Sequence, residues 1–112
     1  MARIVAVAPD LLLGSRISEA LSAAGHEVTL SASASEAPLG EAELLICDLE
    51  RESVEALVGL GVPVLGFYPH MKAELRQVAE ATGADLVVPR SRMVRELPQL
   101  VSRLLAEHRA SS

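Results

Sequence analysis

Five short apolar runs, separated by breaks and by segments of helical periodicity, constrain the fold of this 112-residue chain most strongly. The first run, residues 3–8 (RIVAVA), is continuous and rich in β-branched residues, as is typical of a strand buried on both faces of a parallel sheet. Four further strands are predicted over residues 26–31, 42–49, 62–67 and 85–88. Residues 26–31 alternate apolar and polar side chains, so this strand is expected at a sheet edge.

Helical patterns fill most of the intervals between these strands. Helices are predicted over residues 11–24, 52–60 and 71–82, and a last one begins near Glu96, because Pro98 is tolerated only in a first turn. Residues 32–41 have room for at most one or two helical turns. Strands that alternate with helices through short loops predict an α/β fold with parallel strands. We expect a single domain over residues 1–112, a three-layer sandwich whose five-stranded parallel sheet has the order 2-1-3-4-5.

Composition excludes several classes of function. Ten basic and fifteen acidic side chains give a net charge of −5, which disfavours binding to nucleic acid or to anionic membranes. Phe67 and Tyr68 are the only aromatic residues, so stacking on bases is not expected. The chain has no run long enough to span a bilayer and starts without the pattern of a signal peptide, so a cytoplasmic location is expected. Cys47 lies within an apolar run and is expected to be a buried free thiol.

In sheets of this kind, ligands bind outside the carboxyl ends of the strands. The loops expected at that edge carry two acids, two aromatic or imidazole side chains, two arginines and a serine, and the first helix adds one more arginine nearby. These candidate ligand-binding residues are Asp10, Arg16, Tyr68, His70, Arg90, Ser91 and Arg92, together with Asp48 at the end of the third strand. No zinc-ligand spacing, dinucleotide motif or P-loop is present, so we predict no metal site and no cofactor. The sequence also lacks a nucleophile–base pair, so we predict no catalytic residue and no enzyme.

Three motifs in order, LLICDLE (residues 44–50), VPVLGFYPH (62–70) and GADLVVPR (83–90), resemble the receiver domain of bacterial response regulators. The resemblance covers nearly the whole chain and implies that Asp48 takes the place of the phospho-accepting aspartate. Tyr68 takes the place of the switch Thr or Ser. Arg90 takes the place of the invariant lysine, with Pro89 before it rather than after it.

The first strand departs from the receiver pattern. A receiver ends this strand with two adjacent acids that hold Mg²⁺, whereas this chain has Ala8 and Pro9 there, and only Asp10 follows. Transfer of a phosphoryl group to a carboxylate needs a cation to neutralise the developing charge, and a planar Arg replaces a flexible Lys. We therefore expect a degenerate receiver, or pseudo-receiver, that is not a Mg²⁺-dependent phospho-acceptor.

Two acidic candidates each have a functional and a structural interpretation. Asp48 either contacts a ligand or phosphoryl group, or pairs with Arg90 or caps the next helix. Asp10 has the spacing of an N-cap for the first helix, and a ligand contact is the second interpretation.

The remaining candidates have the same two kinds of interpretation. Arg90, Ser91 and Arg92 form an anion site together with Arg16, or they are solvated charges with Ser91 capping a turn. Tyr68 and His70 are a gating or acid–base pair, or ordinary residues of a loop.

The sequence supports two functions of different classes. The first is a stand-alone regulatory or protein-interaction domain whose partner is another protein. The second is a sensor of a small anionic metabolite or nucleotide at the strand carboxyl ends. We also expect a homodimer through the last helix, because the set of Met93, Val94, Leu97, Val101 and Leu105 exceeds what one narrow apolar stripe needs.

Overall fold

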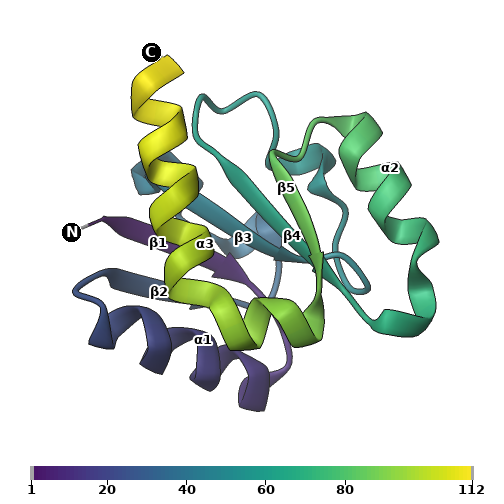
Figure 1. The fold of residues 1–112 in the computed structure, drawn as a ribbon, viewed down its shortest axis with the longest axis horizontal. Coiled ribbons are helices and arrows are strands. Elements are labelled where there is room, and N and C mark those ends of the chain that lie inside the picture. The colour runs from purple at the N-terminus through teal and green to yellow at the C-terminus, as the bar shows by residue number, and fades with distance from the viewer. Residues whose placement is uncertain (1, 112) are drawn as a thin grey trace.

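The computed structural model describes residues 2–111, which contain one parallel sheet (Figure 1). Its strands are β1 (Arg3–Val7), β2 (Glu27–Ser31), β3 (Leu44–Asp48), β4 (Val64–Tyr68) and β5 (Leu86–Pro89). The order is β2-β1-β3-β4-β5, and every neighbouring pair is parallel. The predicted five-stranded sheet and its strand order are confirmed, with β2 at one edge.

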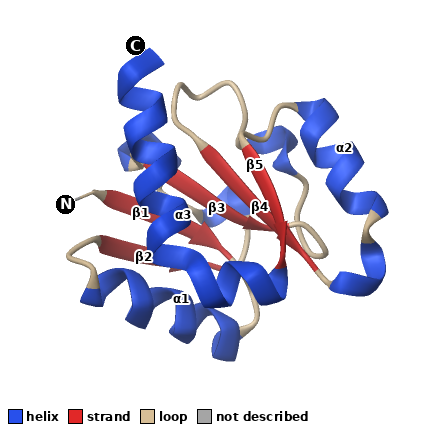
Figure 2. Ribbon diagram, in the orientation of Figure 1, coloured by secondary structure: helices blue, strands red, loops and turns tan. Residues whose placement is uncertain are grey.

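Helices pack on both faces of the sheet, which gives the predicted three layers (Figure 2). Helices α1 (Leu11–Ala23) and α3 (Arg90–Ser111) cover one face. Helix α2 (Glu74–Thr82) covers the other face, together with the short 3₁₀ turns η1 (Ala34–Glu36), η2 (Leu39–Glu41) and η3 (Val54–Ala56). A fourth such turn, η4 (His70–Lys72), precedes α2.

Four of the strands, β1, β3, β4 and β5, contribute to two separate hydrophobic cores because successive side chains point to opposite faces. In β3, Leu44 and Ile46 pack against α1 and α3, whereas Leu45 and Cys47 pack on the side of α2. All five residues of β3 are buried, including its last residue, Asp48. The central strand therefore delivers a carboxylate to the carboxyl edge of the sheet.

The helix predicted over residues 52–60 is wrong, because only the 3₁₀ turn η3 forms there. The apolar spacing is nevertheless used, since Val54 and Leu57 are both buried in the second core. Residues three apart face the same side in a 3₁₀ helix as well as in an α-helix. Two glycines with positive φ, Gly59 and Gly61, then turn the chain towards β4.

The predicted start of the last helix near Glu96 is also wrong. Helix α3 begins at Arg90, directly after β5, and Pro98 lies inside it. A proline inside a helix removes one backbone hydrogen bond and clashes with the carbonyl four residues earlier, here that of Val94. Figure 1 shows that α3 bends partway along its length, and such a bend accommodates a proline.

The apolar residues on which the homodimer expectation rests belong to the monomer's own core. Met93, Leu97, Val101 and Leu105 are all buried against the sheet and α1, and Val94 is half-buried against the same core. These five side chains therefore do not form a free apolar patch. A dimer through α3 would have to use the charged outer residues of this helix.

Candidate functional site

The carboxyl end of β1 carries no acidic pair. Ala8 is buried and Pro9 is half-buried there, and Asp10 follows as the N-cap of α1. The Oδ1 atom of Asp10 accepts hydrogen bonds from the backbone N–H groups of Leu12 at 3.0 Å and Leu13 at 3.2 Å. The predicted cap is confirmed, and its carboxylate is turned towards the helix backbone.

Asp48 lies at the end of β3 and is only 1% exposed. Its Oδ1 atom accepts a hydrogen bond from the backbone N–H of Glu50 at 3.1 Å, and its backbone carbonyl accepts from Arg51 and Glu52. Burial raises the pKa of the Asp48 carboxyl, while the Glu50 N–H and then the charge of Arg90 oppose that increase. The side chain thus bonds within the turn that follows β3. The predicted cap of a helix over residues 52–60 is wrong, because that helix does not form.

Arg90 is the first residue of α3 and reaches back towards the β3 loop. Its Nη2 atom lies 3.7 Å from Oε1 of Glu50, so its ion pair is formed with Glu50. No ion pair joins Arg90 to Asp48 among the described residues, although the positive charge still lowers the pKa of that carboxyl. The Nε atom of Arg90 is buried and has no hydrogen-bond partner within residues 2–111.

Tyr68 and His70 differ in their burial and in their contacts. Tyr68 is the last residue of β4 and is 5% exposed within the second core. It belongs to the same core as Leu75 and Ala79 of α2. His70 is exposed in η4 and makes no hydrogen bond or ion pair with the described residues. The structure therefore does not bring these two residues together as an acid–base pair.

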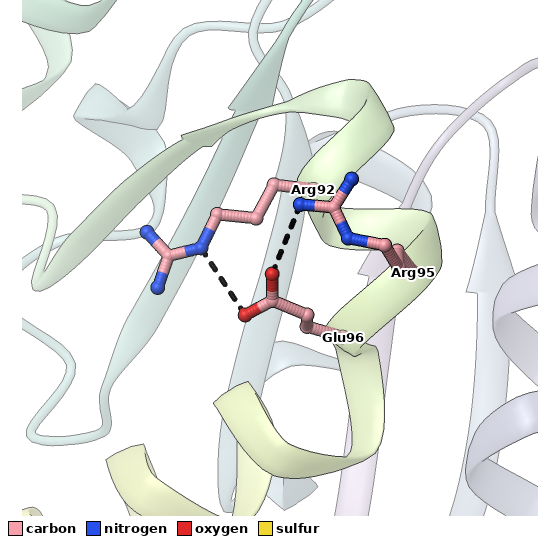
Figure 3. A network of polar contacts seen from close by, with 3 residues as sticks. All are labelled: Arg92, Arg95 and Glu96. Carbon is pink, nitrogen blue, oxygen red and sulfur yellow. Dashed lines mark hydrogen bonds and ion pairs between the residues drawn. The ribbon is translucent and has the colours of Figure 1, made fainter.

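Arg92 is occupied by a pairing on its own helix. Its Nε atom lies 3.3 Å from Oε1 of Glu96, and Nη2 of Arg95 lies 3.1 Å from Oε2 of the same carboxylate (Figure 3). Hydrogen bonds from Arg95 and then Arg92 lower the pKa of Glu96. Ser91, the neighbouring candidate, is exposed at the start of α3.

Arg16 is an exposed residue of α1 that forms no ion pair or hydrogen bond within residues 2–111 through its side chain. It lines a small cavity of about 170 Å³ between the first turns of α1 and α3. The lining residues are Asp10, Leu12, Leu13, Arg16, Arg90 and Val94. Of the predicted ligand-binding residues, the structure brings three together here.

Residues 2–111 contain no group of three or more His, Cys, Asp or Glu side chains that is arranged to hold a metal ion. Over the same residues, no helix is both long and apolar enough to cross a membrane. A larger open cavity, of about 570 Å³, is not lined by Asp48. Its lining includes Val5 of β1, Glu27 of β2 and His26, which precedes β2.

Sequence reasoning missed two features of this edge. One is Glu50, the partner of Arg90, which follows the LLICDLE aspartate by two residues and had no distinguishing pattern of its own. The other is the apolar part of the cavity, which Leu12 and Val94 supply. Three consecutive leucines at a helix start were a usable signal, since only Leu13 of residues 11–13 is buried.

The sequence matches no protein-family model and no curated protein at a significant level. The structure, in contrast, is similar to many solved chains. One is NtrX from Brucella abortus in complex with ADP, with a TM-score of 0.84 and 19% identity. The match covers 98% of this chain but 28% of the NtrX chain, so this chain spans little more than a quarter of that protein.

Two solved receiver domains match over their whole length. The CheY-like receiver domain protein from Methanospirillum hungatei JF-1 has a TM-score of 0.79 and 20% identity, with 100% of this chain and 99% of that chain covered. The receiver domain protein from Clostridium thermocellum has a TM-score of 0.83 and 14% identity, with 100% of both chains covered. At such identities the likeness defines the fold alone. The fold of this chain is that of a response-regulator receiver domain.

Proposed function

We propose that this chain is a receiver-like regulatory or protein-interaction domain that works without Mg²⁺-dependent phosphorylation of Asp48. The observation that carries the proposal is the end of β1, where Ala8 and Pro9 stand and Asp10 is held as the cap of α1. A receiver that uses Mg²⁺ needs acidic oxygens at this place. Signals would then pass through contacts with a protein partner, which the chain's surface binds.

The surroundings of Asp48 support the same proposal. Magnesium requires near-octahedral oxygen coordination and is usually held by one or two carboxylates together with water and phosphate oxygens. Asp48 is almost fully buried, and one of its oxygens already accepts a hydrogen bond from Glu50. An attacking carboxylate must also be ionised, and burial raises the pKa of this one.

The cation at the lysine position is also engaged elsewhere. Phosphoryl transfer depends on positioning and on electrostatic stabilisation of the equatorial oxygens. Arg90 pairs with Glu50, and its planar guanidinium differs in geometry from the compact ammonium of lysine. Tyr68 fills the switch position with a side chain buried in the second core, where a small hydroxyl would stand in a receiver.

A second candidate function is the sensing of a small anion at the same edge of the sheet. It is favoured by two guanidinium groups that line one cavity, those of Arg90 and of Arg16, whose side chain has no partner within residues 2–111. Arg92 leaves this set, because it is paired with Glu96. The structures of NtrX, a much longer protein, were solved in complex with ADP and with ATP. A nucleotide is therefore one of the anions to test.

The first experiment is an amide NMR titration of the full chain with Mg²⁺ and then with beryllofluoride, an analogue of a bound phosphoryl group. We expect no saturable shifts at Asp48, Tyr68 or Arg90, because the acidic oxygens for the metal are missing. The Asp48→Asn variant is the matched control and should give the same flat response. Saturable shifts that start at Asp48, spread to α3 and disappear in Asp48→Asn would overturn the proposal.

A further inference from the structure

The cavity between α1 and α3 combines two chemical characters. Its volume is about 170 Å³, and it opens at the carboxyl edge of the sheet. Charged groups on one side come from Asp10, Arg16 and Arg90, and apolar groups come from Leu12, Leu13 and Val94. A ligand that fits both parts must itself be amphipathic.

The charged groups favour an anion. Two arginines and one aspartate line the cavity, and Arg90 is also paired with Glu50 outside it, at 3.7 Å. Asp10 is already hydrogen-bonded by the N–H groups of Leu12 and Leu13, whereas the side chain of Arg16 has no partner within residues 2–111. The guanidinium of Arg16 is therefore available to an anion.

The apolar groups favour a hydrocarbon tail. Leu12 is 71% exposed although it lies beside the buried Leu13, and Val94 is half-buried across from it. Covering these side chains removes apolar surface from water, which is favourable. A fully hydrated ion such as inorganic phosphate would leave this surface uncovered.

We propose that the cavity binds a small carboxylate with a short apolar tail. The carboxylate accepts hydrogen bonds from the guanidinium of Arg16, and Arg90, which lines the same cavity, adds positive charge. Guanidinium groups match the planar geometry of carboxylates well. The tail lies against Leu12 and Val94. Sites for drug-sized ligands occupy roughly 300–1,000 Å³, so a cavity of this size suits a ligand of about four to six carbon atoms. This inference rests on the second candidate function and names its ligand class.

The test compares ligands that differ in one property at a time, by NMR titration of the isotopically labelled full chain. Isovalerate has the charge and the tail, isovaleramide has the same shape without the charge, and acetate has the charge without the tail. Inorganic phosphate and ATP represent other anions. We expect saturable shifts at Leu12, Arg16 and Val94 with isovalerate, and at least about tenfold weaker binding of isovaleramide and of acetate.

Variants then connect the binding to the two parts of the cavity. Arg16→Gln should weaken isovalerate binding about tenfold by removing a charged donor. Leu12→Asn should reduce the preference for isovalerate over acetate, and its exposed position leaves the fold intact. Arg51→Gln is the matched control, because Arg51 is also an exposed arginine but lies outside this cavity, so binding should be unchanged.

Several results would overturn the inference. They are the absence of saturable isovalerate shifts at millimolar concentrations, equal binding of isovaleramide, or full binding by the Arg16→Gln variant. Binding of phosphate or ATP at Arg16 and Arg90 without isovalerate binding would refute the carboxylate class and leave the second candidate function standing. A response of Asp48 to beryllofluoride bears only on the phosphorylation-independent function, so the proposals fail separately.

Discussion

Replacing Asp10 with alanine separates the cap of α1 from any role in metal binding. The Oδ1 atom of Asp10 accepts two hydrogen bonds from the helix backbone, at 3.0 and 3.2 Å, and the side chain is exposed. Loss of such a cap costs typically about 1 kcal/mol of unfolding free energy. For a domain of this size, that loss lowers the melting temperature by about 4 °C.

The measurement is urea and thermal unfolding of the wild type, Asp10→Ala and Asp10→Asn, each with and without Mg²⁺. Asparagine keeps the capping oxygen but removes the charge, so Asp10→Asn should match the wild type in stability. A ligand that binds the native state raises the unfolding free energy by mass action. We expect that Mg²⁺ is not bound, so it should stabilise none of the three proteins. The reasoning is refuted if Asp10→Ala unfolds like the wild type, or if Mg²⁺ stabilises the wild type and not Asp10→Asn.

Three further predictions test the buried site and the backbone. Burial raises the pKa of Asp48 above its unfolded value, so the stabilising contribution of this group is lost as pH rises through the folded pKa. The Asp48→Asn variant should therefore be more stable than the wild type at neutral pH, and the difference should shrink in acid. Equal urea midpoints of the two proteins at neutral pH would contradict this. Burial, followed by the charges of Glu52 and Asp48, raises the pKa of the Cys47 thiol to about 12. Ellman's reagent should therefore label this thiol only after the protein unfolds. Rapid labelling of the native protein would show that the thiol is not buried. Gly83 ends α2 with φ of 121°, so Gly83→Ala should lower the unfolding free energy by about 1 kcal/mol or more. At Gly40 an added Cβ meets nothing within 4 Å, so Gly40→Ala should lower it far less. Equal losses of unfolding free energy in the two variants would argue against a backbone origin.

The sheet could be predicted from the sequence because burial on two faces leaves a strong local pattern. β3 reads as a continuous apolar run, and all of its residues are buried. β2 reads as an alternating run, and its residues are exposed or half-buried at the sheet edge. Each pattern reflects which faces of the strand its neighbours bury, and it is visible in the strand's own residues. A single sequence is therefore enough to predict these strands.

The wrong helix over residues 52–60 and the wrong start of α3 have a different origin. In both places tertiary packing decides between backbone conformations that have similar local sequence patterns. Val54 and Leu57 satisfy the second core through a 3₁₀ turn, and their spacing does not distinguish this turn from an α-helix. Burial of Met93 and Leu97 holds the first turns of α3 in place, and this packing offsets the penalty of Pro98 inside the helix. Neither contribution is visible in a short window of sequence.

At the candidate site, residue identities were predictable but pairings were not. Motif order placed Asp48, Tyr68 and Arg90 at the ends of β3, β4 and β5, and the structure has them there or one residue beyond. Which carboxylate Arg90 chooses depends on the path of the loop after β3, and that loop brings Glu50 within 3.7 Å. Arg92 was a candidate anion ligand, yet Glu96 stands four residues later on a helix that was predicted to start too late to pair them.

The pairings support the proposal that this edge of the sheet is not a phosphorylation site. A site that transfers phosphoryl groups keeps its charges available, so that a metal and a substrate complete the coordination. Here the polar groups are completed by the chain itself, since Asp10 bonds the α1 backbone, Asp48 bonds Glu50 N–H, and Arg90 pairs with the Glu50 side chain. Arg16, which lines the cavity between α1 and α3, has no such partner within residues 2–111. For this reason we propose that a ligand binds between these two helices, where it would contact both, and not at the strand ends.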